Sequence, residues 1–442
     1  MKVKSICCIG AGYVGGPTMS VIALKCPNLK VTVVDVNEER INSWNGPLDK
    51  LPIYEPGLSK VVGEVRGKNL FFSTDIERAI QESEMIFMAV NTPTKTEGEG
   101  AGMAADLKYV EASAKKIGQS ATTDKIVVEK STLPVRTAEK IKEILNKHGN
   151  GLHFEILSNP EFLAEGTAIQ DLFKSDRVLI GGDSTPSGKK AVNALVDIYS
   201  QWIPEEKILT TNVWSSELAK LASNAMLAQR VSSINSLSAL CEITGGKIRE
   251  LSKAVGMDHR IGTKFLKASV GFGGSCFQKD ILNLVYLCRY YGLDEVAEYW
   301  HQVVKINEYQ KHRFSSRVIE YFEHNKLDKK ISILGWSFKS NSNDSRESPS
   351  IYVAKYLLEA GFHLNIYDPK VSSDRINEDL STFNQNSNQI YIHNSLEEVL
   401  NSSRTLLILN DWDEFKRLDF NKHNIFNGSF LNIPECIYQI GN

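Results

Sequence analysis

The sequence predicts an α/β fold in which two parallel-sheet domains are joined by a long helical segment. Short apolar runs alternate with helical patterns up to residue 212, and this alternation resumes after residue 325. Between them the chain shows helical patterns alone. Such alternation is typical of parallel sheets with helices on their faces. We therefore expect three domains, at residues 1–212, 213–325 and 326–442.

Length and composition restrict the class of protein. The 442 residues are too many for one hydrophobic core, and 42% hydrophobic with 24% charged residues is ordinary for a soluble protein. The net charge of -2 gives no reason to expect a nucleic-acid partner. The seven cysteines are scattered, which favours a reducing compartment, and no apolar run could span a membrane. We expect a cytoplasmic enzyme without a metal ion.

The first domain opens with a dinucleotide-binding pattern. An apolar run at residues 3–9 leads into GAGYVG at residues 10–15, which fits G-x-G-x-x-G, and a helical pattern follows. In this context Gly10 makes the tight turn, Gly12 lets the backbone approach a pyrophosphate, and Gly15 lets the helix pack on the strand. The helix N-terminus then faces the phosphates. Strand, motif and helix together predict a Rossmann-type domain.

An acidic residue indicates which dinucleotide binds. A second apolar run at residues 30–36 contains Asp35, twenty residues beyond Gly15. A carboxylate there accepts hydrogen bonds from the adenosine ribose and repels a 2′-phosphate, so NAD is preferred over NADP. Arg40 leaves the alternative open, because it could lie over the adenine or receive a 2′-phosphate.

Polar residues follow several later strands of this domain. The apolar run at residues 85–90 ends in Asn91 and Thr92, and the run at 125–130 ends in Ser131 and Thr132. The carboxyl ends of parallel strands line the cofactor crevice, although ordinary turn chemistry would give the same residues.

A third polar loop follows the strand at residues 155–158. There Pro160 lies between the strand and the two acids Glu161 and Glu165. The loop is either part of a site or a capped turn with solvated acids.

The all-helical middle begins with a long helix over about residues 215–243. Lys220 and Asn224 are four residues apart and share one face of it. Together they could polarise one oxygen, as in an oxyanion hole; the alternative is that both are surface residues. A helix of this length with an apolar face is also a common dimerisation element.

A glycine-rich stretch at residues 270–280, VGFGGSCFQKD, precedes another helical pattern. Cys276 is therefore expected at a helix N-terminus, where the helix dipole favours the nucleophilic thiolate. Asp280 follows one turn later. A thiol, a carboxylate and a flexible loop suit covalent chemistry on a carbonyl carbon; the alternative is a structural cysteine behind a turn.

The last domain has apolar runs at residues 329–334, 363–367, 390–392, 405–409 and 429–433, which we interpret as strands. Residues 335–337 read GWS and do not fit G-x-G-x-x-G, so this domain need not bind a dinucleotide. Lys339 and Arg346 lie in a polar loop, where they either hold phosphates or are simply solvated.

These motifs together resemble the UDP-glucose/GDP-mannose dehydrogenase family. The similarity runs from residue 6 to about 420 and rests on GAGYVGGP, VDVN, LPIYEPGL, AVNTPT, EKST, SNPEFLAEG, WSSELAKLASNA, KFLKASVGFGGSCFQKD, DSRESPS and IYDP, in that order. The resemblance implies two Rossmann-like domains joined by a helical dimerisation core. It also implies a homo-oligomer, either a dimer or a hexamer.

The resemblance further implies NAD-dependent, four-electron oxidation of UDP-glucose to UDP-glucuronate. Cys276 matches the family nucleophile, Lys220 and Asn224 match the residues that stabilise oxyanions, and Glu161 and Asp280 match its proton-transferring carboxylates. Thr132 resembles the threonine that holds a catalytic water. The implied cofactor contacts are Gly10, Gly12, Tyr13, Val14, Gly15, Asp35, Arg40, Val90, Asn91, Thr92, Ser131, Thr132, Glu165 and Arg346.

The implied substrate contacts are Glu161, Phe162, Leu163, Ala164, Glu165, Lys220, Asn224, Arg260, Lys267, Phe272, Gly273, Cys276, Phe277, Phe338 and Lys339. Among them Arg260 is expected to reach the site of a neighbouring subunit. The chain departs from the family near its end, where an Asp-Gly-Arg is common but residues 427–429 read NGS. Two alternatives stay open: a dehydrogenase for GDP-mannose or UDP-N-acetylmannosamine, and a nucleotide-sugar-binding protein with little turnover.

Overall fold

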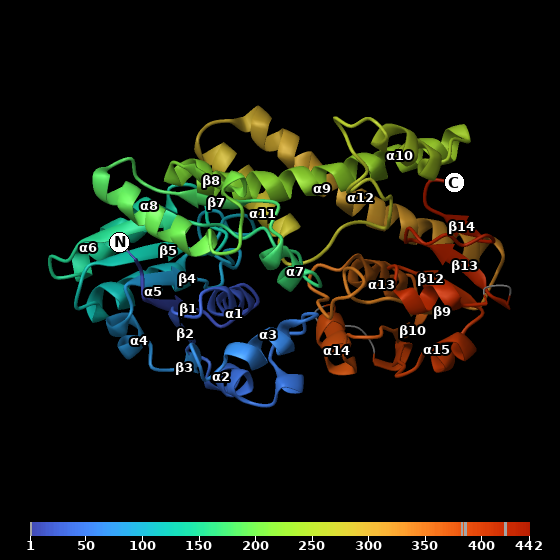
Figure 1. Cartoon of the computed structure of the whole chain (residues 1–442). Coiled ribbons are helices and arrows are strands. Elements are labelled where there is room, and N and C mark those ends of the chain that lie inside the picture. The colour runs from blue at the N-terminus through green and yellow to red at the C-terminus, as the bar shows by residue number, and fades with distance from the viewer. Residues whose placement is uncertain (1, 382, 384–386, 420–421) are drawn as a thin grey trace. The chain divides into compact units, whose positions relative to one another are not determined.

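The structure, a computed structural model, describes residues 2–381, 383, 387–419 and 422–442 (Figure 1). It contains two compact units, Met1–Ser223 and Asn224–Asn442, and each is described by itself. The division into three domains stays a prediction. Within the described residues, no helix combines the length and apolar character that crossing a membrane requires.

The first unit is built on an eight-stranded sheet in the order β3-β2-β1-β4-β5-β6-β7-β8. The order reverses between β1 and β4, and such a point is where open α/β sheets bind ligands. β3 is a strand that the sequence analysis missed, because its four residues are flanked by polar turns. The strands are β1 (Ser5–Ile9), β2 (Lys30–Val34), β3 (Leu70–Ser73), β4 (Met85–Met88), β5 (Lys125–Glu129), β6 (Phe154–Ser158), β7 (Val178–Gly181) and β8 (Ile208–Thr211).

Helices cover both faces of this sheet because successive strand residues point to opposite sides. On β1, Ile6 and Cys8 belong to one hydrophobic core and Cys7 and Ile9 to the other. The first core is closed by α1 (Gly15–Lys25), α2 (Glu38–Asn45), α3 (Leu58–Val65), α7 (Ala168–Phe173) and α8 (Pro186–Tyr199). The second is closed by α4 (Ile76–Glu82), α5 (Lys108–Ser120) and α6 (Thr137–His148).

One strand pair departs from the expected parallel arrangement. β6 and β7 are antiparallel and meet through a single residue pair, Ser158 with Gly181, whereas β7 and β8 are parallel. Ser158 is the last residue of β6 and Gly181 is the last residue of β7, so the two strands meet only at their carboxyl ends. The predicted fold of two parallel-sheet, Rossmann-like domains is confirmed, and this single pair is the local exception among the described strands.

The second unit begins with four helices, of which α9 and α12 are the longest. α9 (Val213–Thr244) begins in the first unit and continues into the second. It is followed by α10 (Ile248–Gly256), α11 (Phe277–Tyr290) and α12 (Asp294–His324). The long helix expected over about residues 215–243 thus occurs as α9, with ends that differ by one or two residues.

The second unit also contains a six-stranded sheet, in the order β11-β10-β9-β12-β13-β14. If β9 is counted as strand 1, the order is 3-2-1-4-5-6, which is also the order of the first six strands of the first sheet. Its helices include α13 (Pro349–Glu359), α14 (Ser373–Ser381) and α15 (Leu396–Ser402). The strands are β9 (Lys330–Leu334), β10 (His363–Tyr367), β11 (Ile390–Ile392), β12 (Thr405–Ile408), β13 (Asn424–Asn427) and β14 (Tyr438–Gln439).

The second sheet repeats the tight turn that follows β1 in the first sheet. Gly335 has φ 99°, and Asp368 follows β10 as Asp35 follows β2. Asp368 Oδ2 accepts hydrogen bonds from the Trp336 and Ser337 amides at 2.7 and 3.0 Å. A Cβ on Gly335 would lie 2.4 Å from the Asn410 side chain. The two sheets thus share this local geometry, while residues 335–337 read GWS in place of the glycine motif.

The strand predicted at residues 429–433 is wrong; the actual strand is β13, which ends at Asn427. The Asn427 side chain accepts from the Ser429 amide and donates to the Leu431 carbonyl, at 3.0 and 2.9 Å. These bonds fold the chain into a turn at the point where the apolar pattern suggested an extended segment.

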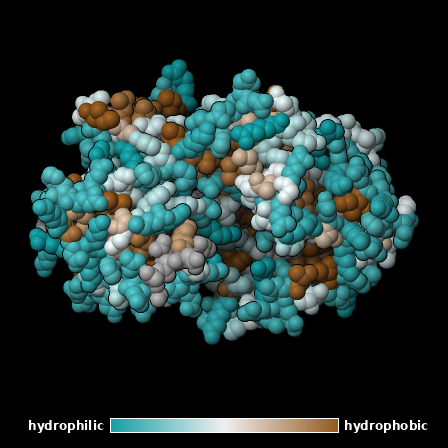
Figure 2. Space-filling view, turned by 180° about the vertical axis from the view of Figure 1, so that it is seen from behind, coloured by the Kyte–Doolittle hydropathy of each residue, from teal (hydrophilic) through white to brown (hydrophobic). Residues whose placement is uncertain are grey.

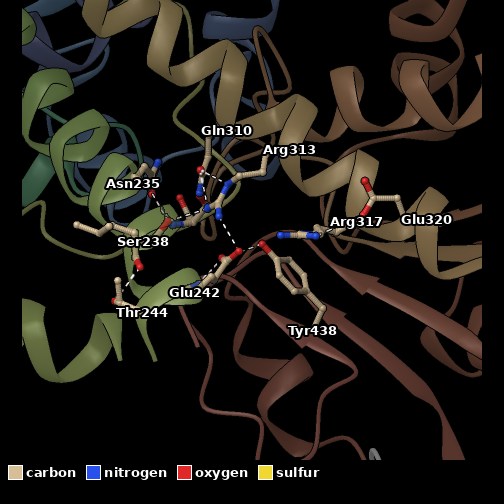
Figure 3. A network of polar contacts seen from close by, with 12 residues as sticks. Asn235, Ser238, Glu242, Thr244, Gln310, Arg313, Arg317, Glu320 and Tyr438 are labelled. Carbon is tan, nitrogen blue, oxygen red and sulfur yellow. Dashed lines mark hydrogen bonds and ion pairs between the residues drawn. The ribbon is translucent and has the colours of Figure 1, made fainter. Parts of the chain in front are cut away.

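The end of the chain is held by a polar network between α9 and α12 (Figure 3). Glu242 is paired with Arg313 at 2.7 Å, and it also accepts from the Tyr438 hydroxyl and the Gly441 amide. Arg313 further donates to Ser238 at 2.8 Å. This network fixes β14 against the helices of the same unit.

Candidate active site

The glycine loop after β1 has the geometry that the sequence predicts. Gly10 has φ 111°, and a Cβ there would lie 2.3 Å from the Ala89 carbonyl oxygen. A Cβ on Gly15 would lie 2.0 Å from the Gly10 oxygen, so helix and strand can pack this closely only with glycine. A Cβ on Gly12 would meet no described atom within 4 Å, which leaves room for a ligand.

The acid after β2 sits beside this loop. Asp35 is buried, and its Oδ2 accepts from the Ala11 amide at 2.9 Å, while Oδ1 accepts from the Asn37 amide at 2.9 Å. Arg40 is 3.1 Å from Oδ2. A carboxylate has about four acceptor positions, so Oδ1 can still bind a ribose hydroxyl. The loop and this acid together fit an adenosine diphosphate group.

The loops after β4 and β5 are tied to each other. Ser131 Oγ donates to the Val90 carbonyl at 2.6 Å, and Thr92 Oγ1 donates to the Thr132 carbonyl at 3.1 Å. The first loop follows β4, which borders the reversal point of the sheet, and the second follows β5, the next strand. Val90, Thr92, Ser131 and Thr132 are thus brought together, and the exposed Asn91 lies within the same loop.

Glu161 lies after β6 and is paired with a buried lysine that the sequence analysis missed. Lys130 Nζ is 3.0 Å from Glu161 Oε2 and also donates to Asn159 and Tyr199. Burial acts to raise the pKa of Glu161, but the charge of Lys130 and its hydrogen bond outweigh this, so the pKa lies below its ordinary value. Glu161 is therefore an anion at neutral pH.

The loop from Glu161 to Gly166 is held by two further carboxylates. Asp171 accepts from the Ala164 amide at 2.9 Å, and Glu55 accepts from the Gly166 and Ala168 amides at 2.8 and 2.6 Å. Glu55 also accepts from the hydroxyl of Tyr13 in the glycine loop. Glu55 thus links the predicted cofactor loop to the loop that carries Phe162, Leu163 and Glu165.

Lys220 approaches this loop from α9. It is buried, and its Nζ lies 5.5 Å from the centre of the Phe162 ring, whose face also packs 3.8 Å from the Arg177 guanidinium. The structure therefore places Lys220 close to the Glu161 loop.

In the second unit, Cys276 is the N-cap residue of α11 and is exposed. Asp280 lies in the first turn of that helix, is buried, and accepts from Asn224 Nδ2 at 2.6 Å. Lys279 Nζ is 3.1 Å from the other oxygen of Asp280. The thiol thus has access to a substrate, while the carboxylate one turn later is fixed by Asn224.

The loop before Cys276 is anchored to α12. Asn307 accepts from the Phe272 amide at 2.8 Å and donates to the Phe272 carbonyl at 3.0 Å. The rings of Phe272 and Phe277 pack edge to face at 5.7 Å. Phe272 and Phe277 flank the segment that contains Gly273 and Cys276, and the contact between their rings holds the two ends of this segment together.

Phe338 lies against the same loop, because a Cβ on Gly274 would be 3.0 Å from its ring. Lys339 Nζ lies 5.4 Å from that ring. The Arg346 carbonyl accepts from the Gly274 amide at 2.9 Å, and its guanidinium is 2.6 Å from Asp344.

The described contacts of two further predicted residues are with other partners. Arg260 is exposed and paired with Asp258 at 2.6 Å, and no described contact joins it to the Cys276 loop. Lys267 is exposed, with its Nζ 5.8 Å from the Phe430 ring. Ser429, the last residue of the NGS at residues 427–429, is buried and bonded to Asn427.

Comparison with known proteins assigns a family to this arrangement. Three domains of the UDP-glucose/GDP-mannose dehydrogenase family match the chain. They are the NAD-binding domain at residues 4–203, the central domain at 214–309 and the UDP-binding domain at 332–429. The chain belongs to the UDP-glucose/GDP-mannose dehydrogenase family. It therefore carries the NAD-binding domain of that family, and the glycine loop and Asp35 lie within it.

Individual relatives agree with this membership. The chain is 59% identical to the UDP-glucose 6-dehydrogenase of Mus musculus over 96% of this chain and 86% of the mouse protein. It is 57% identical to UDP-glucose 6-dehydrogenase 1 of Glycine max over 94% of this chain and 89% of that protein. The solved UDP-glucose dehydrogenase from Pyrobaculum islandicum has 29% identity and a TM-score of 0.87, covering 99% and 98% of the two chains.

Sequence reasoning missed Lys130 and Glu55, which the family fold places beside predicted site residues. A signal for Lys130 existed, since a lysine that directly follows a buried apolar strand needs a partner. Glu55 lies in the quoted LPIYEPGL motif, but no spacing rule connects it to Tyr13 or Gly166.

Proposed function

We propose that this chain catalyses the NAD-dependent, four-electron oxidation of UDP-glucose to UDP-glucuronate. Turning the C6 alcohol into a carboxylate consumes one water and two NAD and releases two NADH. The high identity to UDP-glucose 6-dehydrogenases supports this substrate. The observation that carries the mechanism is the exposed Cys276 at the N-terminus of α11, one turn before the buried Asp280.

The glycine loop and Asp35 would hold NAD, which would supply the hydride acceptor for both oxidations. Glu161, held as an anion by Lys130, serves as the base for the C6 hydroxyl. Lys220 and Asn224 stabilise the negative charge that develops on the C6 oxygen. Thr132 orients the water that is used later.

The second oxidation requires covalent capture. The Cys276 thiolate adds to the C6 aldehyde and forms a thiohemiacetal, whose alkoxide is again stabilised by Lys220 and Asn224. Loss of the second hydride gives a thioester. Water cleaves the C6–sulfur bond, which releases the carboxylate and the free thiol. Asp280 and Glu161 exchange the protons that these steps consume and release.

Recognition of the nucleotide sugar is assigned to the remaining predicted contacts. Lys267 and Lys339 supply positive charge for the diphosphate, and Phe272, Phe277 and Phe338 pack around the Cys276 loop. We assign the cofactor, helical and UDP-sugar parts to residues 1–212, 213–325 and 326–442.

We further propose that the chain acts as a homo-oligomer in the cytoplasm. Figure 2 shows hydrophobic groups interrupting a mainly hydrophilic face. On α9 the side chains of Met226, Leu240 and Ile243 are 58%, 56% and 81% exposed, which favours burial against a second copy. Light scattering of the purified chain would detect a dimer or hexamer, and a monomer at micromolar concentration would contradict this. The free thiols, which Cys276 chemistry requires, agree with a reducing compartment.

Asp35 is expected to set the preference for NAD. In the Asp35→Asn variant the 2′-phosphate of NADP no longer meets a carboxylate, and Arg40 loses its ion-pair partner and can bind that phosphate. We expect the ratio of kcat/KM for NADP to that for NAD to rise at least tenfold, which equals about 1.4 kcal/mol. Adding Arg40→Met to Asp35→Asn should remove most of the rise in this ratio. An unchanged ratio in Asp35→Asn would show that Asp35 does not set the preference between NAD and NADP.

The substrate is tested by comparing kcat/KM for UDP-glucose, GDP-mannose and UDP-N-acetylmannosamine, with the product identified by mass spectrometry. We expect UDP-glucuronate and a clear preference for UDP-glucose. Preference for another sugar would show that the chain is a dehydrogenase for that nucleotide sugar. Binding of UDP-glucose without any NADH would support the binding-protein alternative.

A further inference from the structure

Glu347, a residue outside the predicted site, contacts the chain on both sides of Cys276, after it through the side chain and before it through the backbone. Glu347 Oε2 accepts from Gln278 Nε2 at 3.0 Å, and Gln278 lies in the first turn of α11, two residues after Cys276. The same oxygen accepts from the hydroxyl of Tyr352 on α13. The carboxylate therefore ties the start of the nucleophile's helix to α13.

The backbone of the same residue supports the loop before Cys276. A Cβ on Gly273 would lie 2.4 Å from the Glu347 carbonyl oxygen, so the two backbones are in direct contact. The neighbouring Gly274 amide donates to the Arg346 carbonyl at 2.9 Å. The backbone of residues 346–347 thus contacts Gly273 and Gly274, which precede Cys276. The Glu347 side chain contacts Gln278, which follows it.

Glu347 adopts a backbone conformation that is unfavourable for its residue type. Its φ is 52°, in the left-handed region, which is unfavourable for a residue with a Cβ. A capping Ser348 bond to the Ser350 amide begins α13 directly afterwards. The strained conformation is what places the Glu347 carbonyl against Gly273 while its side chain reaches Gln278.

The buried Lys311 supports the Glu347 carboxylate indirectly, through Tyr352. Lys311 on α12 is fully buried, and its Nζ lies 3.7 Å from the centre of the Tyr352 ring and 2.6 Å from Glu308. This fixes the ring whose hydroxyl binds Glu347. The chain of contacts runs from α12 through α13 to the first turn of α11.

We propose that Glu347 is a positioning residue for Cys276. It holds the glycine loop and the first turn of α11 in one arrangement, so that the thiol meets the C6 aldehyde before the aldehyde leaves. The inference rests on the proposed role of Cys276 as the nucleophile. Glu347 itself touches none of the reacting atoms.

The test compares two substitutions of Glu347. Asparagine tolerates the left-handed backbone but its shorter side chain cannot reach Gln278, whereas glutamine keeps the reach and an acceptor oxygen. For Glu347→Asn we expect fewer than two NADH per UDP-glucose, a free C6 aldehyde that hydroxylamine traps, and at least a tenfold fall in kcat with KM for UDP-glucose little changed. Glu347→Gln should restore two NADH per sugar.

Tyr352→Phe and Tyr356→Phe give a matched pair on α13. The first removes one bond to the Glu347 carboxylate and should show a weaker form of the same defect. The second removes a hydroxyl one turn later, on a ring that packs against His312, and should behave as wild type. Two NADH per sugar and wild-type kcat in both Glu347→Asn and Tyr352→Phe would overturn the proposal.

Hydrogen exchange separates this inference from the proposed chemistry. We expect the amides in the first turn of α11 to exchange faster in Glu347→Asn than in Glu347→Gln, whether or not Cys276 is the nucleophile. Unchanged exchange would overturn the positioning role. Faster exchange in Glu347→Asn would support the positioning role. If Cys276→Ser at the same time kept full two-step turnover, the proposed function would be contradicted, while the positioning role of Glu347 would stand.

Discussion

Replacing Cys276 with serine is expected to abolish net turnover. A hydroxyl is a far weaker nucleophile than a thiolate at neutral pH, so the aldehyde is not captured and the second oxidation fails. We expect steady-state NADH formation to fall on the order of 10³-fold or more. With enzyme in excess over UDP-glucose, at most one NADH per sugar should form.

Cys436→Ser is the control for this experiment. Cys436 is half-buried, and its Sγ lies 3.6 Å from the Ile433 carbonyl, a contact that serine can keep. Its turnover should stay close to that of the wild type. Full two-step turnover in Cys276→Ser would remove the thiol from the mechanism.

Replacing Lys130 with methionine is expected to affect both stability and pH dependence. The substitution leaves the Glu161 carboxylate, whose side chain is only 13% exposed, without its partner at 3.0 Å. Breaking a buried pair in this way typically costs about 3–5 kcal/mol at neutral pH. Without Lys130 the pKa of Glu161 rises, so the acid limb of the pH–rate profile should move to higher pH.

The stability effect has a defined pH dependence. In the wild type the lowered pKa of Glu161 contributes stability above the ordinary glutamate pKa, and this is lost as pH falls through the folded-state pKa. In Lys130→Met the raised pKa has the opposite effect. The difference in thermal midpoint between the two proteins should therefore shrink from pH 7 to pH 4.

Lys125→Met is a matched control at the first residue of β5, the strand that Lys130 directly follows. Lys125 is also buried, but it donates to the carbonyls of Gln81 and Ser83 instead of pairing with Glu161. It should lower stability without moving the acid limb of the pH–rate profile. An unmoved acid limb in Lys130→Met as well would show that Glu161 is not the titrating base.

The parts of the fold that follow from local chemistry could be predicted from the sequence. Gly10, Gly15 and Asp35 were predictable because a tight turn, a close packing contact and a ribose acceptor each demand one residue type at one spacing. The N-cap position of Cys276 followed from the glycine-rich loop and the helical pattern after it. Each of these signals lies within one short stretch.

Features that depend on distant segments could not be predicted in the same way. The antiparallel pairing of β7 and the turn at Asn427 are set by how the chain returns to the sheet and by a side-chain bond, not by apolar periodicity. Lys130 and Glu347 look like ordinary charged residues until the fold brings Glu161 and Gln278 to them. Charged residues of this kind are recognised only by their partners.

The most direct test of the proposed function is the number of NADH molecules formed per UDP-glucose when the sugar is limiting and the reaction has gone to completion. Two NADH per sugar is the predicted result, because it requires both oxidations and therefore capture of the aldehyde. One NADH per sugar would contradict the thioester half of the mechanism. No NADH, with UDP-glucose still bound, would contradict the assignment of this chain as an oxidising enzyme.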